Sequence, residues 1–411
     1  MRRFSLATAI AIAIAIAVGT LALGMAAPAT AQVRIGLIDM YGGGFAAQAD
    51  AIRTGFQIAI DEANAAGGVK GQRFALTTAD MGISVEKAIT EARRMILDDK
   101  MKFVTVGSHS GAAVALADLL KNQNALGLGA FATTKRFTGE EGHDLIARGN
   151  LSTVEIGRIM AEHIKGMPQI KRIATIAPDF EFGKHFVDDF LAAIKVARPD
   201  IVVVRQEWPK FGAADFTPQA TALQSAQTDM IVSALFSGDL INFLKAAKDF
   251  DLFGSKTRFF TSGADLVKMA AIRDSIPEGS LVTVWYPFYS INSPESTRFV
   301  DEVRKRTNTY PVGSTAVGYV SGKMLTLGIQ RAKDPNDPRS VAAAFSDLEF
   351  TGPTGPVKVR ACDHMALYNF YVGTVKKEDK MPDGIGVADV KAYHTSGYAR
   401  SCEEIARLRK R

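Results

Sequence analysis

The stretch VRIGLIDMYGGGFAAQADAIRTGFQIAIDEANA, residues 33–65, sets the pattern that decides the fold. Residues 33–38 form a short apolar run typical of a buried strand, and residues 46–65 have the spacing of an amphipathic helix that ends at Gly67-Gly68. A buried strand that leads through a glycine-rich loop into a helix is the repeating unit of a doubly wound sheet. The stretch therefore predicts an α/β fold with parallel strands.

The same alternation of strand and helix continues along the chain in two series. In the first, strands are expected at 74–78 and 103–106 and helices at 85–98 and 112–122. The second begins after residue 150, with helices at 153–165, 184–196, 220–225 and 240–250 and strands at 172–177, 201–205, 230–235 and 259–261. Because each series has its own apolar pattern and 411 residues are too many for one typical core, we expect two doubly wound parallel-sheet lobes.

The last third of the chain does not follow this alternation of strands and helices. A strand at 281–285 leads into the aromatic run 285–289, followed by helices at 294–306, 314–331 and 339–345 and a strand pair at 357–360 and 367–372. We expect these helices to cover the first lobe, so the chain should cross between lobes near 150, near 284 and at 351–356. Three crossing strands make a hinge that is restricted but can bend. The expected units are a signal peptide at 1–31, a first lobe at 32–150 plus 285–350, a second lobe at 151–284 plus 351–380, and a C-terminal tail at 381–411.

The N-terminus indicates export. Arg2 and Arg3 precede an apolar run at about 7–23, and Ala29-Thr30-Ala31 offers the small-x-small pattern that a signal peptidase cleaves. We therefore expect cleavage before Gln32 and a periplasmic mature chain. The alternative is a membrane anchor, since the apolar run is nearly long enough to span a bilayer.

Composition bears on three points: nucleic-acid binding, the oxidation state of the cysteines, and metal binding. The chain has 49 Lys and Arg against 43 Asp and Glu, and its one basic cluster, 407–411, is expected to be a solvated tail, so we expect no nucleic-acid partner. Cys362 and Cys402 are the only cysteines, and in an exported protein they are expected to form a disulfide that pins the tail. No His, Cys or carboxylate spacing suits a metal, so we expect no metal and no cofactor.

The loop Gly42-Gly43-Gly44-Phe45-Ala46-Ala47 formally fits a dinucleotide-binding fingerprint before a helix. Asp80 ends the next strand, as a ribose-binding acid should, but lies 36 residues past Gly44 instead of about 20. An exported chain also has little access to NAD. A flexible loop that lines a cleft is the better interpretation.

Polar side chains are expected at the carboxyl ends of the first-lobe strands, where open α/β sheets bind ligands. In Gly107-Ser108-His109-Ser110-Gly111, Ser110 is placed to cap a helix that starts at Ala112, and its hydroxyl with the free N–H groups suits a carboxylate. The alternative is a plain cap without a ligand. Thr133 follows the neighbouring strand, while loops 178–183 and 235–239 bring aromatic residues from the second lobe. No acid and base pair is assembled, so we do not expect an enzyme.

Several stretches together resemble the periplasmic binding proteins of branched-chain amino-acid-type ABC transporters. The resemblance covers residues 32–375 and implies the type I two-lobe fold of leucine-binding proteins. The residues that carry it are Thr54-Gly55, Asp61-Glu62-Ala63-Asn64, Gly67-Gly68-Val69-Lys70-Gly71, Ser110, Ala132-Thr133, Thr138, Asp179, Phe182-Gly183, Phe190, Gly318-Tyr319 and Gly352-Pro353-Thr354-Gly355.

The resemblance implies a set of binding residues. The Ser110 and Thr133 hydroxyls, with the Phe131 backbone, would hold a ligand carboxylate. Phe182 stands where amino-acid binders have a Tyr, so this position keeps a ring and loses the phenol. The remaining candidates are a second aromatic wall at Phe236, an acid for an α-ammonium at Asp265, and possible cleft walls at Tyr41, Gln48, His109 and Tyr286.

The implied function is delivery of a small carboxylate ligand to the membrane permease of an ABC importer by hinge closure. The ligand is open among a branched-chain or other apolar amino acid, an aromatic carboxylate, an amide and urea. We expect a monomer. The alternative role is a ligand-sensing subunit of the same fold that controls a receptor or regulator.

Overall fold

The computed structural model describes residues 32–254, 256–264 and 269–410. Its first sheet is parallel throughout, with the strand order β2-β1-β3-β4-β5. Its strands are β1 (Gln32–Asp39), β2 (Arg73–Asp80), β3 (Phe103–Val106), β4 (Leu126–Gly129) and β5 (Ile146–Arg148). The helices that connect them are α2 (Ala46–Ala65), α3 (Val85–Arg93) and α4 (Ser110–Leu120).

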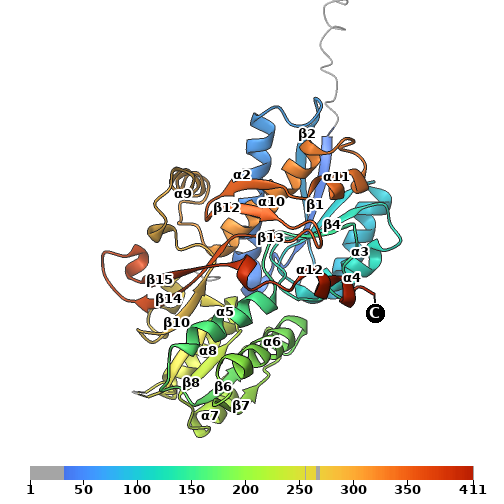
Figure 1. Ribbon diagram of the computed structural model, residues 1–411. Coiled ribbons are helices and arrows are strands. Elements are labelled where there is room, and N and C mark those ends of the chain that lie inside the picture. The colour runs from blue at the N-terminus through green and yellow to red at the C-terminus, as the bar shows by residue number, and fades with distance from the viewer. Residues whose placement is uncertain (1–31, 255, 265–268, 411) are drawn as a thin grey trace, which may run out of the picture.

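The second sheet repeats this topology and then extends it. Its parallel strands run in the order β7-β6-β8-β9-β10, the same winding as in the first sheet. Strand β14 pairs antiparallel with β10, and β15 pairs antiparallel with β14. The strands are β6 (Arg172–Ile176), β7 (Val202–Glu207), β8 (Met230–Ser233), β9 (Arg258–Thr261), β10 (Leu281–Val284), β14 (Asn369–Lys376) and β15 (Gly386–His394). The helices are α5 (Thr153–Lys165), α6 (Glu181–Ala197), α7 (Thr217–Ser225) and α8 (Ser237–Asp249). Two doubly wound lobes are therefore confirmed (Figure 1).

The late helices pack against the first lobe. They are α9 (Pro294–Thr307), α10 (Gly313–Arg331) and α11 (Pro338–Ala344). The axes of α2 and α10 cross so closely that a Cβ on Gly55 would lie 1.9 Å from the Thr315 carbonyl oxygen, and one on Gly318 would lie 2.3 Å from that of Ile52. Both glycines belong to the stretches that carry the family resemblance, and close helix packing explains why a side chain is excluded there.

The third crossing between lobes lies later in the chain than expected. Strands β11 (Glu349–Gly352), β12 (Gly355–Val359) and β13 (Ala366–Leu367) form a small sheet of their own, and Met365 bridges to Arg148 at the end of β5. Only β14, which starts at Asn369, joins the second sheet. The crossing is therefore at Tyr368 and not at 351–356.

A single amide links the three crossing segments. Asn150 is fully buried, and its Oδ1 accepts hydrogen bonds from Trp285 Nε1 at 2.9 Å and from Tyr368 Oη at 2.8 Å. Its Nδ2 donates to the Phe131 carbonyl oxygen at 3.0 Å. Asn150, Trp285 and Tyr368 each stand on a different crossing, so one side chain holds the hinge together. We call these three residues the hinge amide cluster.

The C-terminal segment makes a fourth crossing that the sequence did not predict. After β15, Thr395 exchanges two hydrogen bonds of 3.1 Å with the Tyr368 backbone, beside the third crossing. The chain then returns to the first lobe and ends in α12 (Cys402–Leu408), where Cys402 is bonded to Cys362. The expected disulfide is confirmed. Arg409, expected in a solvated cluster, donates to the carbonyl oxygens of Cys362 at 3.1 Å and Thr138 at 3.0 Å, so the tail is docked.

In the part of the chain that the structure describes, no helix combines the length and the apolar character needed to cross a membrane.

Candidate functional site

A small cavity lies between the lobes, at the carboxyl ends of strands from both sheets. It is lined by Gln48, Ser108, Phe131, Thr133, Ile156, Phe182, Phe236, Ser262 and Trp285. These positions flank the points where each strand order reverses, which is where open α/β sheets bind ligands. The cavity measures about 20 Å³, room for about one water, so the lobes are closed on each other and a larger ligand requires the side chains that line the cavity to move apart.

The structure brings five of the ten expected site residues to this cavity. Phe131, Thr133, Phe182, Phe236 and Gln48 line it. Four other expected residues do not line it: Ser110, His109 and Tyr286 are buried, Tyr41 is half-buried, and Tyr286 lines a different hollow. Asp265 lies outside the described residues. Ser108, Ser262, Ile156 and Trp285 were not among the expected site residues.

The N-terminus of α4 is capped differently from the sequence expectation. The helix begins at Ser110, and His109 is the cap, its Nδ1 accepting a hydrogen bond from Ala112 N at 3.1 Å. Burial lowers the pKa of His109 to about 4, so the ring is neutral at pH 7 with its proton on Nε2. Ser110 Oγ instead accepts from Thr134 N at 3.3 Å, which ties the loop after β4 to the helix. Because Ser110 acts as an acceptor there, its own hydroxyl proton can be donated elsewhere.

A buried carboxylate that sequence analysis missed stands behind Ser108. Asp39 ends β1 and is fully buried, and burial raises the pKa of its carboxyl group against the opposing effect of its hydrogen bonds. Its Oδ1 accepts from Ser108 Oγ at 2.6 Å, Ser108 N at 3.1 Å and Met40 N at 2.9 Å. Gly107 leaves room for it, because a Cβ there would lie 1.9 Å from Asp39 Oδ2. In the sequence, the only indication of this residue's role was that an Asp follows the first predicted strand.

Aromatic rings from both lobes pack together beside the cavity. Phe45 in the first lobe lies 4.6 Å from Phe211 between ring centroids, and His109 lies 5.2 Å from Phe180. On the second lobe Phe180 stacks on Phe211 at 4.4 Å. Phe236 joins the group at 5.6 Å from Phe45. This aromatic cluster reaches the cavity through Phe236, and no local sequence pattern predicted that Phe211 belongs to it.

The glycine-rich loop after β1 meets the second lobe through its backbone. A Cβ on Gly44 would lie 3.4 Å from Gly238 Cα, and the adjacent Gln48 Oε1 accepts from Ser237 Oγ at 2.8 Å. The lack of side chains in this loop therefore allows the two lobes to approach closely. Asp80 accepts hydrogen bonds from Tyr41 N at 2.9 Å and Gly82 N at 3.0 Å. The acid that a dinucleotide site would use for ribose is therefore bonded to backbone groups of nearby loops.

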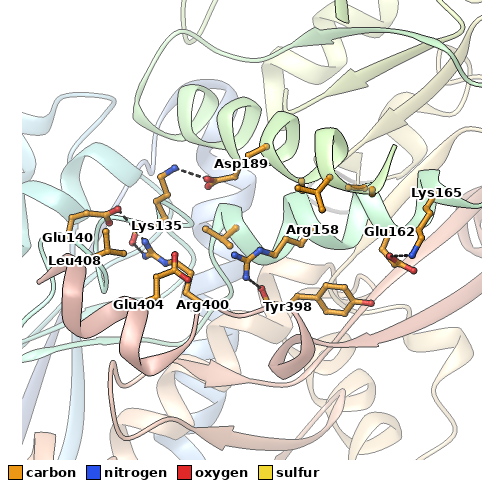
Figure 2. Close-up of a pocket in the computed structure, with 16 residues that line it drawn as sticks. Lys135, Glu140, Arg158, Glu162, Lys165, Asp189, Tyr398, Arg400, Glu404 and Leu408 are labelled. Atoms are coloured by element: carbon orange, nitrogen blue, oxygen red, sulfur yellow. Dashed lines mark hydrogen bonds and ion pairs between the residues drawn. The ribbon is translucent and has the colours of Figure 1, made fainter. Parts of the chain in front are cut away.

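The loop after β4 in the first lobe also contacts one face of α6 in the second lobe. Thr134 Oγ1 donates to Glu181 Oε1 at 2.9 Å, and Arg136 approaches the same carboxylate at 3.4 Å. Lys135 pairs with Asp189 at 2.6 Å, a contact that Figure 2 shows, with only 22% and 11% of the two side chains exposed. We call these five residues the α6 latch.

Figure 2 looks into a second and larger hollow, of about 770 Å³, between α5, α6 and the C-terminal tail. Many of its charged side chains are already paired, among them Lys135 with Asp189, Arg400 with Glu140 and Lys165 with Glu162. It lies away from the strand ends, so the small cavity is the better candidate for a ligand site.

This arrangement of two wound lobes around a cleft can be compared with known proteins. A family model described as periplasmic binding protein matches residues 32–380. The chain belongs to this family. Members of the family are solute-binding transport proteins.

Relatives and solved structures agree with the family. The chain is 26% identical over 319 residues to the Leu/Ile/Val-binding protein BraC3 of Rhizobium johnstonii, covering 78% of this chain and 84% of that protein. It is 25% identical over 333 residues to a leucine-, isoleucine-, valine-, threonine- and alanine-binding protein of Pseudomonas aeruginosa, covering 80% and 85%.

Among solved structures, a solute-binding protein of an ABC transporter from Rhodopseudomonas palustris in complex with p-hydroxybenzoic acid has a TM-score of 0.80 at 19% identity, covering 90% of this chain and 100% of that chain. The closed form of a leucine-, isoleucine-, valine-, threonine- and alanine-binding protein from Brucella ovis has a TM-score of 0.78 at 21% identity, covering 90% and 97%. At these identities the likeness establishes the fold alone.

Proposed function

We propose that this chain is the exported solute-binding subunit of an ABC importer and that it holds a small carboxylate with an apolar or aromatic body. The observation that carries the proposal is the composition of the cavity lining. Hydroxyl groups come from Ser108 and Thr133 of the first lobe and from Ser262 of the second, and phenyl rings come from Phe131 of the first lobe and from Phe182 and Phe236 of the second. Among the described residues, no side chain that lines the cavity is charged. Relatives named for apolar amino acids and a fold neighbour with a bound hydroxybenzoate support this ligand class.

A carboxylate can be held here without a cation. His109 Nδ1 already accepts from Ala112 N, so the N–H groups available to a ligand at the start of α4 are those of Ser110 and Gly111, where the positive end of the helix dipole favours an anion. The Ser110 hydroxyl has a proton to donate, because its contact with Thr134 uses its lone pair. Thr133 supplies a second hydroxyl from the neighbouring strand end. The carboxylate would sit between these groups, with the apolar body against the second-lobe rings.

The hinge then converts binding into closure. The Gln48–Ser237 bond and the α6 latch join the lobes only when the cleft is shut, so a ligand that bridges both walls favours the closed state. The closed form is the one that a permease would recognise. We propose a monomer as the working unit.

Calorimetry with leucine, benzoate, 4-hydroxybenzoate and benzamide tests the ligand class. At least one carboxylate should bind, and benzamide should bind much more weakly. Ser110→Ala and Thr133→Val should each weaken carboxylate binding about tenfold to a hundredfold, the effect of losing one hydrogen bond to a charged group. The exposed α7 variants Ser225→Ala and Thr221→Val are matched controls and should bind as the wild type does. Equal binding of benzamide, or unchanged affinity in both cleft variants, would overturn the proposal.

Two further measurements address the finer points. Asp265→Asn should abolish binding only of a ligand that carries an ammonium group, which separates amino acids from other acids. N-terminal sequencing of the exported protein should begin at or near Gln32; an intact residue 1 in the membrane fraction would contradict signal-peptide cleavage.

A further inference from the structure

The direction of one hydrogen bond in the cleft is fixed by what stands behind it. Ser108 lines the cavity, and its hydroxyl lies 2.6 Å from Asp39 Oδ1. That oxygen already accepts two backbone hydrogen bonds, from Met40 N and Ser108 N. An oxygen toward which three donors converge is an acceptor, so the serine is the donor.

The assignment does not depend on the charge of the carboxyl group. If Asp39 is ionised, both oxygens can only accept. If it is protonated, the proton resides on Oδ2, which has no hydrogen-bond partner and lies against Gly107, while Oδ1 still faces the three donors. In both states the Ser108 proton points away from the cavity. The hydroxyl therefore offers only lone pairs to a ligand.

This geometry has a chemical consequence for what can touch Ser108. A carboxylate oxygen there would meet another acceptor, with a buried carboxyl group behind it, and would be repelled. A hydroxyl or amino hydrogen would instead be accepted, and the short bond to Asp39 increases the electron density on the serine oxygen. Within one cavity, Thr133 and the start of α4 suit the ligand carboxylate, and Ser108 suits a donor.

We propose that Ser108 selects a carboxylate that also bears a hydroxyl or amino hydrogen-bond donor, over the unsubstituted parent acid, and that Asp39 is the positioning residue that fixes this preference. The proposal rests on the proposed function, since it assumes a carboxylate in this cleft. It goes further in naming the second polar group of the ligand and the residue that recognises it.

Calorimetry on matched ligands tests the proposal without any variant. The probes are benzoate, 3- and 4-hydroxybenzoate and 4-methoxybenzoate, and 4-methylpentanoate with its 2-hydroxy and 2-amino (leucine) forms. In the better-bound series, a donor-bearing member should bind at least about fivefold to tenfold more tightly than the parent, the contribution of one hydrogen bond. The methoxy compound keeps the size and loses the donor, so it should show no such gain.

Variants then assign the preference to residues. Ser108→Ala should reduce the ratio between donor-bearing and parent acids to about twofold or less while the parent keeps its affinity. Ser225→Ala, which removes an exposed serine hydroxyl on α7 outside the cavity, is the matched control and should keep the ratio. Asp39→Asn preserves an acceptor at Oδ1, so it should keep the preference for hydroxyl donors and weaken it only for the ammonium of leucine.

The outcomes separate the two proposals. A parent acid that binds as well as its hydroxylated form, or a ratio that survives Ser108→Ala, would overturn the role of Ser108 and leave the proposed function standing. Absence of binding by every carboxylate in both series would overturn the proposed function and this inference with it.

Discussion

Asp239 is a carboxylic acid at the point where the lobes meet. It lies in the first turn of α8 and is 2% exposed, and its Oδ2 accepts one hydrogen bond, from Gly212 N at 3.2 Å. Desolvation by burial raises the pKa of Asp239 from 3.8 to about 6, against the lowering effect of that bond. A raised pKa in the folded state means that the folded protein binds the proton more tightly than the unfolded chain does. The stability that this proton contributes is complete below about pH 4 and is lost as pH rises through about 6.

We therefore expect Asp239→Asn to flatten the pH dependence of stability. The amide keeps an acceptor for Gly212 N and carries no charge to desolvate. At pH 7 the free energy of unfolding should rise by up to about 3 kcal/mol, and at pH 4 it should differ little from that of the wild type. Urea unfolding at both pH values measures this. The exposed α9 variant Asp301→Asn should show neither effect, and an Asp239→Asn protein no more stable at pH 7 than the wild type would contradict the argument.

At the scale of elements, the three crossing segments depend on Asn150. Asn150→Ala would leave the Trp285 indole N–H and the Tyr368 hydroxyl buried without this acceptor. We expect a loss of about 2–4 kcal/mol in the free energy of unfolding, because each unpaired buried donor costs about 1–3 kcal/mol. Chemical denaturation gives the value, with the exposed Asn122→Ala as a control that should change stability by less than about 0.5 kcal/mol. A loss no larger than that of the control would show that the hinge does not rely on this amide.

The α6 latch predicts a second effect at this scale, on affinity. Lys135→Met or Asp189→Asn removes a half-buried contact that exists only in the closed state, so less of the protein is closed and apparent affinity falls. We expect a few-fold loss for each variant. A double-mutant cycle on ligand affinity should give a coupling of about 1 kcal/mol. The exposed pair Lys171–Asp200 lies within the second lobe, so Lys171→Met with Asp200→Asn should show no coupling to binding. Additive losses from the latch variants would count against the latch.

Elements were the level at which sequence analysis succeeded best. Helices such as α5 were placed by their apolar period, and the turn after α2 by glycines whose φ angles of +102° and +68° at Gly67 and Gly68 disfavour other residues. Strand β15 was missed because half of its side chains face solvent at a sheet edge, so its sequence has no buried run. The site was predicted in part: strand-end residues such as Thr133 follow from topology. Contacts such as Phe45 with Phe211 join loops far apart in the chain, and no local pattern encodes them.

At the scale of the whole molecule, the Cys362–Cys402 disulfide anchors the C-terminal segment, which makes the fourth crossing, to the first lobe. The Cys362–Cys402 bond spans 40 residues of sequence, and closing such a loop stabilises by about 4 kcal/mol in the chain-entropy model. The double variant Cys362→Ser, Cys402→Ser should lose about that much free energy of unfolding. Its ligand-free form should also open more widely, because the fourth crossing is no longer anchored. Urea unfolding and small-angle X-ray scattering measure the two effects, and the wild type in reductant should behave as the variant does. Unchanged stability and scattering in the double variant would show that docking of the tail alone is sufficient.

The same bond determines how the molecule would carry a mechanical load. Tension applied between the two ends of the folded chain runs along the backbone to Cys362, passes through the disulfide to Cys402, and bypasses everything between them. The bypassed segment holds β14 and β15, so these two strands bear no direct pull. With about 3.6 Å per extended residue, some 140 Å of contour length stays hidden until the bond is reduced. When the oxidised protein is stretched by its ends, its maximum end-to-end extension is therefore shorter than the number of residues implies. Reduction of the disulfide then adds the hidden length in a single step.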